Sequence, residues 1–134
     1  MLDKRPRPRL VHGVTEEMPT NCGGIFVTTN GVRGEELEVF ARCVHNDPCK
    51  SAMFEGLTRM ISLSLRYGVP TEEVIDQLEG ISCVQGFQWV DGERITSCVD
   101  AISLGIKRFV RSNGNGTVSG YEEEIIERKN RKKL

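Results

Sequence analysis

The segment Thr96-Ser97-Cys98-Val99-Asp100 marks the start of a helix, and the rest of the fold can be worked out from it. Ser97 is placed to cap this helix, and Asp100, three residues later, can complete a capping box. Cys98 falls in the first turn, where free backbone N–H groups and the helix dipole favour a negative charge. A sulfur atom in this position is biased toward the thiolate, the form that binds metal ions and attacks electrophiles. We therefore ask which other groups meet this sulfur.

Residues 25–29 are rich in β-branched and aromatic side chains and predict a strand, and the alternating residues 36–41 predict a second one. Asn30-Gly31 and Gly34 supply the turn between them, so the two strands are expected to form a β-hairpin with a short connection. Residues 10–14 predict a short additional strand, and residues 15–19 are read as a polar break after it.

Two helices are expected in the middle of the chain. Asp47 and Pro48 form a start signal, and the first helix should run to about Tyr67. Its expected buried face consists of Met53, Leu57, Met60, Ile61 and Leu65. Thr71 is expected to cap the second helix, which Gly80 ends. Residues 87–95 predict a small hairpin, and the helix that begins at Cys98 should bury Val99, Ile102, Ile106 and Phe109. These elements predict an α+β domain, with a small antiparallel sheet of about three strands and helices packed on one face.

Composition indicates one soluble domain. The chain has 134 residues and a net charge of -1, with 38% hydrophobic and 28% charged residues. No apolar run reaches the length of a membrane span and the N-terminus lacks an apolar signal segment, so we expect a cytoplasmic protein without a membrane partner. The five cysteines then favour metal binding or burial over disulfides.

Both ends of the chain are basic. Residues 1–20 are expected to form an extended basic arm and the first strand, residues 21–112 the α+β domain, and residues 113–134 a flexible charged tail. Within the arm, Arg5, Arg7 and Arg9 are candidate contacts for a partner or an anion such as a nucleotide phosphate, although a solvated arm explains this composition as well.

Four cysteines lie at junctions between loops and regular elements: Cys22, Cys49, Cys83 and Cys98. Junctions cluster at the ends of a layered domain, so these sulfur atoms could meet and hold Zn²⁺ or an iron–sulfur cluster. No Cys-x-x-Cys pair supports this, and burial as small apolar residues is the alternative. Cys43 and His45 lie near Cys49 in the sequence, and either could replace it as a ligand.

Several segments resemble the TSCPD domain: Thr20-Asn21-Cys22-Gly23, residues 59–69, residues 77–83 and the closing run 96–102. The resemblance covers roughly residues 5–110. It implies an accessory domain of adenosylcobalamin-dependent ribonucleotide reductases, here free-standing. Cys22, Cys83 and Cys98 match the cysteines of the family, and Cys49 matches a position that is often glycine or cysteine. Val99 stands where the family motif has proline, and residues 42–49 replace a glycine-rich connection.

The junctions that hold Cys22, Cys49 and Cys98 are also similar to those of NifU/IscU-type iron–sulfur scaffolds. Together these resemblances imply a metal-binding accessory domain with Zn²⁺, without catalysis of its own, that contacts a ribonucleotide reductase or a related protein. A nucleotide is a further candidate partner. A redox or iron–sulfur scaffold protein is the first alternative. Nucleic-acid binding through the basic ends is the second, and the scarcity of aromatic residues near those ends argues against it.

Overall fold

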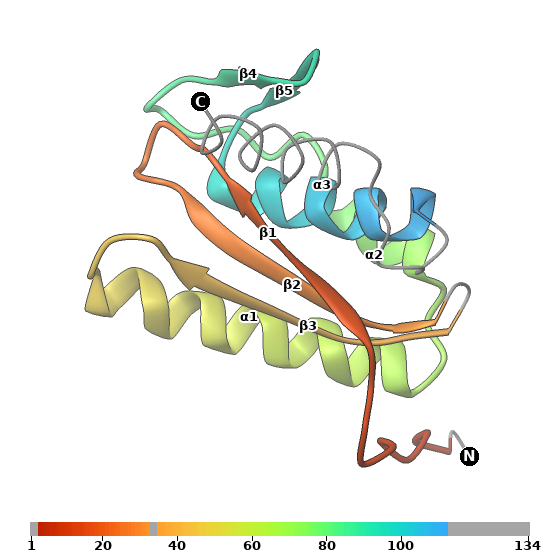
Figure 1. The fold of residues 1–134 in the computed structure, drawn as a ribbon. Coiled ribbons are helices and arrows are strands. Elements are labelled where there is room, and N and C mark those ends of the chain that lie inside the picture. Colours follow the sequence, from red (N-terminus) through yellow and green to blue (C-terminus); the bar gives the residue numbers. More distant parts are fainter. Residues whose placement is uncertain (1–2, 33–34, 113–134) are drawn as a thin grey trace, which may run out of the picture.

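The computed structural model describes residues 3–32 and 35–112 (Figure 1). The elements follow the order β1 (Gly13–Met18), β2 (Ile25–Val32), β3 (Glu35–Cys43), α1 (Pro48–Arg66), α2 (Thr71–Leu78), β4 (Gln88–Val90), β5 (Glu93–Ile95) and α3 (Cys98–Arg111). Strands β1, β2 and β3 form an antiparallel sheet in that order, and β4 pairs with β5 in a separate hairpin. The predicted α+β class with a three-stranded antiparallel sheet is confirmed. The predicted tail, residues 113–134, lies outside the described residues.

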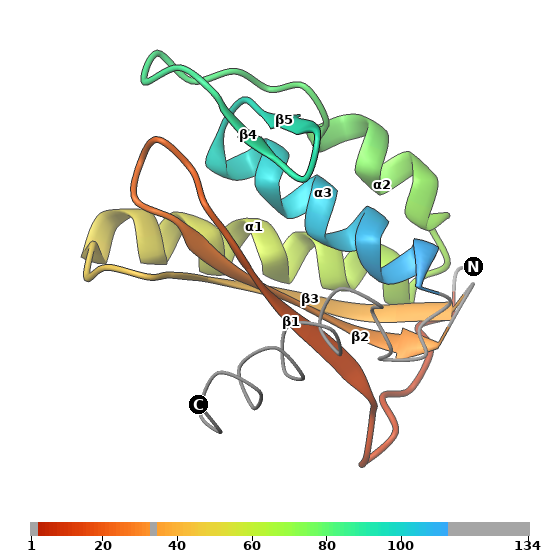
Figure 2. The ribbon, with the colours of Figure 1, turned by 45° about the horizontal axis from the view of Figure 1, so that its top comes forward.

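The sheet has one buried face. Ile25, Val27 and Thr29 of β2 are fully buried on it, while the alternate residues Phe26 and Thr28 are only half-buried. Helix α3 packs on this face so closely that a Cβ atom on Gly105 would lie 2.7 Å from Val27 Cγ1. Because α2 covers α3 in turn, α3 is buried nearly all round (Figure 2).

Helix α1 runs along the outer edge of β3 (Figure 1). Ser62 Oγ accepts a hydrogen bond from Val39 N at 3.0 Å and donates one to Val39 O at 3.1 Å. These contacts satisfy backbone groups that an edge strand would otherwise expose. The buried stripe of α1 consists of Phe54, Thr58, Ile61 and Leu65.

The expected face of α1 is wrong in part, since Met53 is 73% and Met60 61% exposed. Both methionines fit a helical apolar stripe in the sequence, but packing against β3 selects the neighbouring stripe instead. The predicted start is confirmed: Pro48 is the first helical residue, and Asp47 accepts a hydrogen bond from Lys50 N.

Three further boundaries differ from the sequence-based expectation. The first strand spans Gly13–Met18 rather than residues 10–14, because its polar residues pair with β2 as an edge strand. The hairpin strands are longer than expected, because Asn30-Gly31 forms a bulge within the ladder rather than the turn. Thr71 does not cap α2: its hydroxyl donates to Glu36 Oε2 at 2.9 Å, and Pro70 occupies the cap position.

None of the helices in the described part of the chain has both the length and the apolar character needed to cross a membrane.

Candidate thiol site and metal centre

Two cysteines that are far apart in the sequence meet at one end of the sheet, and Cys98 lies near them. Cys22 Sγ lies 3.6 Å from Cys83 Sγ. Cys98 joins them through Thr20, whose hydroxyl lies 3.2 Å from Cys98 Sγ and accepts a hydrogen bond from the Cys22 amide. In both ribbon views the β1–β2 turn and the beginnings of α1 and α3 lie at this same end (Figures 1 and 2).

The turn between β1 and β2 is built around Thr20. Its Oγ1 accepts hydrogen bonds from the amides of Cys22 at 3.2 Å and Gly24 at 3.3 Å. With two donors already on this oxygen, its single proton is free to point at Cys98 Sγ. Gly23 and Gly24 have φ angles of 114° and 80°, which favour glycine and let the chain fold back this tightly. Thr20 therefore fixes the Cys22 backbone and also contacts the Cys98 sulfur.

Asp100 holds the Cys83 segment against the start of α3. Ser97 Oγ accepts from Asp100 N at 3.0 Å, which confirms the predicted N-cap. The Asp100 carboxylate does not close the expected capping box on Ser97. It accepts from Thr96 N at 3.0 Å and from Gly80 N, at the end of α2, at 2.8 Å.

Thr96 completes this connection. Its carbonyl accepts from Cys83 N at 2.9 Å, and its hydroxyl donates to Ile81 O at 2.9 Å. Asp100 and Thr96 therefore attach residues 80–83 to the start of α3, which brings Cys83 to the same end as Cys98. Asn21 adds a second attachment by donating to Gln85 O and Phe87 O.

The two closest thiols differ in acidity. Burial, assisted by the hydrogen bond with Cys83, raises the pKa of the Cys22 thiol to about 11. Hydrogen bonding from the backbone amide of Gln85 and from the Cys22 thiol lowers the pKa of Cys83 below its usual value. Cys83 therefore loses its proton first, and the Cys22 S–H can donate to the resulting thiolate.

Lys50 supplies positive charge to this cluster. Its ammonium group donates to Cys22 O at 2.7 Å and lies 4.0 Å from Cys98 Sγ. Lys50 is in the first turn of α1, and the Asp47 cap on its amide fixes the start of that helix. The Cys98 sulfur thus faces two donors, the Thr20 hydroxyl and the Lys50 ammonium.

The other candidate ligands occupy different surroundings. Cys49 is exposed in the first turn of α1, and Cys43 is buried beside Ser51 Oγ at 3.7 Å. His45 is exposed and lies next to Gly23, where a Cβ atom would be 3.4 Å from its ring. Within residues 3–32 and 35–112, no group of three or more His, Cys, Asp or Glu side chains is arranged to hold a metal ion. Cys49 as the fourth ligand stays a prediction.

The arginines of the arm lie away from the thiols. Arg5 donates to the carbonyl oxygens of Glu36 and Leu65, and Arg7 pairs with Glu38 at 2.9 Å. Arg9 is exposed. A partner or anion contact through these three residues stays a prediction.

Sequence reasoning missed Thr20 and Lys50 as members of the site, as well as the bond from Gly80 to Asp100. A threonine two residues before Cys22 is a local signal for the turn. No local pattern indicates that Lys50 folds back onto a sulfur 48 residues away.

One of the comparisons with known proteins, that with protein-family models, agrees with the sequence pattern. The family model of the TSCPD domain matches residues 3–110, a range that includes Cys22, Cys83 and Cys98. No curated protein and no solved structure matches the chain, and the similarity to NifU/IscU-type scaffolds is not confirmed. The family match is consistent with a domain associated with ribonucleotide reductase. Since the match covers most of its length, this chain belongs to the TSCPD domain family.

Proposed function

We propose that this protein is a metal-binding accessory domain associated with ribonucleotide reduction, with Cys22, Cys83 and Cys98 as ligands of Zn²⁺. The observation that carries the proposal is the 3.6 Å separation of Cys22 Sγ and Cys83 Sγ, which come from residues 61 positions apart. Two thiolates on one tetrahedral zinc ion, with Zn–S bonds of about 2.3 Å, lie about 3.8 Å from each other. The observed distance between the two sulfur atoms is close to this value.

The charges around the sulfur atoms also fit a thiolate-bound divalent ion. Three thiolates and one Zn²⁺ carry one excess negative charge, or two with the Cys49 thiolate as fourth ligand, and the ammonium group of Lys50 would compensate one of them. Cys49 is the predicted fourth ligand, and His45 beside Gly23 is its alternative. With four protein ligands the ion would tie three loops together and leave no position open for a reacting water.

The surface next to Cys83 supports a role in protein contact. Val84 is fully exposed, Phe87 is 49% exposed and Trp89 is 66% exposed. Exposed apolar and aromatic side chains close together are typical of protein interfaces, where tryptophan often contributes much of the binding energy. A metal that stabilises residues 80–83 would also stabilise the segment that bears this surface.

Metal analysis of freshly purified protein tests the proposal. We expect stoichiometric zinc in the wild-type protein, loss of zinc in C22S and C98S, and a lower melting temperature in both. C43S is the matched control, because Cys43 is a cysteine outside the cluster, and it should retain the metal. Zinc content unchanged in C22S and C98S, or absent from all four proteins, would refute the assignment. C49S separately decides whether Cys49 is the fourth ligand.

A dithiol redox protein is the second candidate, and the close contact of Cys22 and Cys83 favours it. The Cys83 thiolate would attack a disulfide of an oxidised partner, forming a mixed disulfide and releasing one partner thiolate. Cys22, after losing its proton, would attack Cys83 Sγ and release the second thiolate. The partner gains two electrons and the pair becomes a disulfide.

Treating metal-free protein with glutathione disulfide distinguishes this candidate. Mass spectrometry should then show loss of two hydrogen atoms and a Cys22–Cys83 peptide pair, in wild type but not in C83S. Failure to form this disulfide excludes the redox role. Brown colour with stoichiometric iron would instead indicate an iron–sulfur cluster.

A further inference from the structure

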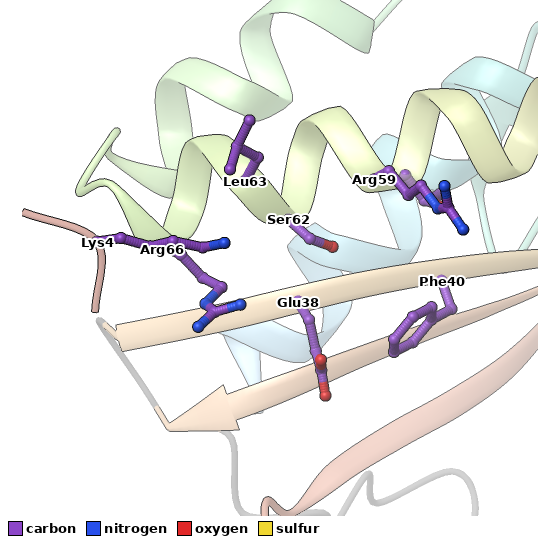
Figure 3. A pocket seen from close by; sticks show the side chains of 8 residues that line it. Lys4, Glu38, Phe40, Arg59, Ser62, Leu63 and Arg66 are labelled. Carbon is purple, nitrogen blue, oxygen red and sulfur yellow. The ribbon is translucent and has the colours of Figure 1, made fainter. Parts of the chain in front are cut away.

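A second candidate site lies on the other half of α1, away from the thiols. A pocket of about 170 Å³ opens between α1, β3 and the N-terminal segment (Figure 3). Its lining includes three cations: Lys4, Arg59 and Arg66. Arg59 and Arg66 follow Lys50 by 9 and 16 residues on α1, which places them about 14 and 24 Å further along the helix axis. The pocket is therefore separate from the cysteine cluster.

The cations that line the pocket are available to bind an anion. Arg66 Nε donates to Arg5 O at 3.0 Å, which orients the guanidinium group. Its two terminal nitrogens and the Lys4 ammonium take part in no hydrogen bond with the rest of residues 3–32 and 35–112. Arg59 pairs with Glu55 at 2.8 Å, but both side chains are largely exposed, and such pairs contribute little. An incoming anion can therefore compete for Arg59.

The one carboxylate in the lining does not cancel this charge. Glu38 accepts hydrogen bonds from Arg7 Nε and Nη2, and Arg7 holds the pKa of this carboxyl below its usual range. Asn30 Nδ2 donates to the same carboxylate at 2.9 Å. Since Arg7 neutralises Glu38, the three remaining cations leave the pocket positive.

An exposed aromatic ring adjoins these cations. Phe40 is 50% exposed on β3 and lines the pocket. Figure 3 shows it at the same end of the pocket as Arg59, with Lys4 and Arg66 toward the other end. A planar base can stack on such a ring. A volume of about 170 Å³ is smaller than the roughly 300 Å³ needed to bury a drug-sized ligand. It suits phosphate groups, with an attached base lying outside over Phe40.

We propose that this pocket binds a nucleotide, with Lys4, Arg59 and Arg66 contacting its phosphate groups and Phe40 contacting its base. Arg66 would present its terminal nitrogens in a fork that matches phosphate oxygens. The site does not depend on the thiols, so it can hold a nucleotide whether or not a metal is bound.

Calorimetric titration of the full chain with ADP, pyrophosphate and adenosine tests the proposal. We expect ADP to bind most tightly, pyrophosphate more weakly and adenosine not measurably. A K4Q/R59Q double variant should lose ADP affinity by about tenfold or more, and F40L should reduce the affinity for ADP to that for pyrophosphate. All three substituted residues are exposed, so unchanged melting curves should show that the variants are folded.

R42Q is the control. Arg42 is an exposed cation on β3, the strand that carries Phe40, and its guanidinium group lies over Phe26, outside the pocket. It removes one positive charge and should change ADP affinity less than twofold. An equal loss in R42Q and K4Q/R59Q, or a dissociation constant weaker than about 1 mM for ADP, would overturn the site. Equal affinities of wild type for ADP and pyrophosphate would overturn the contact with the base.

Discussion

Replacing Asp100 by Asn should destabilise the protein and separate Cys83 from Cys98. Asp100 is 6% exposed, and each of its carboxylate oxygens accepts one backbone amide, from Gly80 at 2.8 Å and from Thr96 at 3.0 Å. Asn keeps the shape of the side chain but replaces one carboxylate oxygen, an acceptor, by an NH₂ group, a donor. One buried backbone N–H, of Gly80 or Thr96, then faces a side-chain N–H instead of an acceptor. The other bond weakens because its acceptor is no longer charged.

The magnitude follows from these two bonds. A hydrogen bond to a charged acceptor contributes about 1.5–3 kcal/mol, and a buried donor without a partner costs about 1–3 kcal/mol. These contributions overlap, so we expect D100N to lower the free energy of unfolding by about 2–4 kcal/mol. With a urea m-value of about 1.5 kcal/mol/M, a loss of about 3 kcal/mol shifts the midpoint by about 2 M.

Urea unfolding followed by circular dichroism is the assay. D91N is the matched control, since Asp91 pairs with Arg108 at 2.7 Å but has a side chain that is 70% exposed. Its φ of 51° is one that Asn adopts as readily as Asp. D91N should change stability by less than about 1 kcal/mol. A D100N effect no larger than that of D91N would refute the role we assign to the carboxylate. D100N should also retain less zinc than D91N.

Three other predictions concern the core, the arm and the thiols. G105A should lower the free energy of unfolding by about 1–2 kcal/mol in chemical unfolding, because a Cβ atom 2.7 Å from Val27 Cγ1 overpacks the contact between α3 and the sheet. This cost exceeds the gain in helix propensity from glycine to alanine. A stabilised variant would contradict this packing. The lowered pKa of Glu38 means that its pairing with Arg7 stabilises the fold above the ordinary carboxyl pKa, and that this contribution is lost as pH falls through the lower folded value. Stability measured between about pH 5 and pH 3 should therefore fall less steeply in R7Q than in wild type, and identical slopes would exclude this pair as the cause. In metal-free protein at neutral pH, iodoacetamide should modify Cys83 before the buried cysteines, because the pKa of Cys83 is lowered. Peptide mass spectrometry measures the rate of modification at each cysteine. Equal rates at all sites would argue against the hydrogen bonds assigned to the Cys83 thiolate.

Local sequence patterns were sufficient for most element types, although residues 15–18, expected to be a polar break, form most of β1. Asp47-Pro48 and Ser97 predicted both helix starts correctly, because capping depends on side chains within three residues of the amides they satisfy. The hairpin of β2 and β3 was predicted for a similar reason, since strand pairing across a short turn is local. Thr71 was misassigned as a cap because its hydroxyl has a better partner, the buried carboxylate of Glu36, in a distant strand.

The sequence by itself determined the α+β class and the position of Cys22, Cys83 and Cys98 at the ends of their elements. Only the tertiary structure decided that Cys22 and Cys83 approach to 3.6 Å and that Lys50 faces Cys98. Backbone propensity and capping act over a few residues, whereas these contacts span 61 and 48 residues. They exist because α1 packs along β3 and α3 packs on the buried face of the sheet, and burial of apolar surface sets that packing without a local sequence signal.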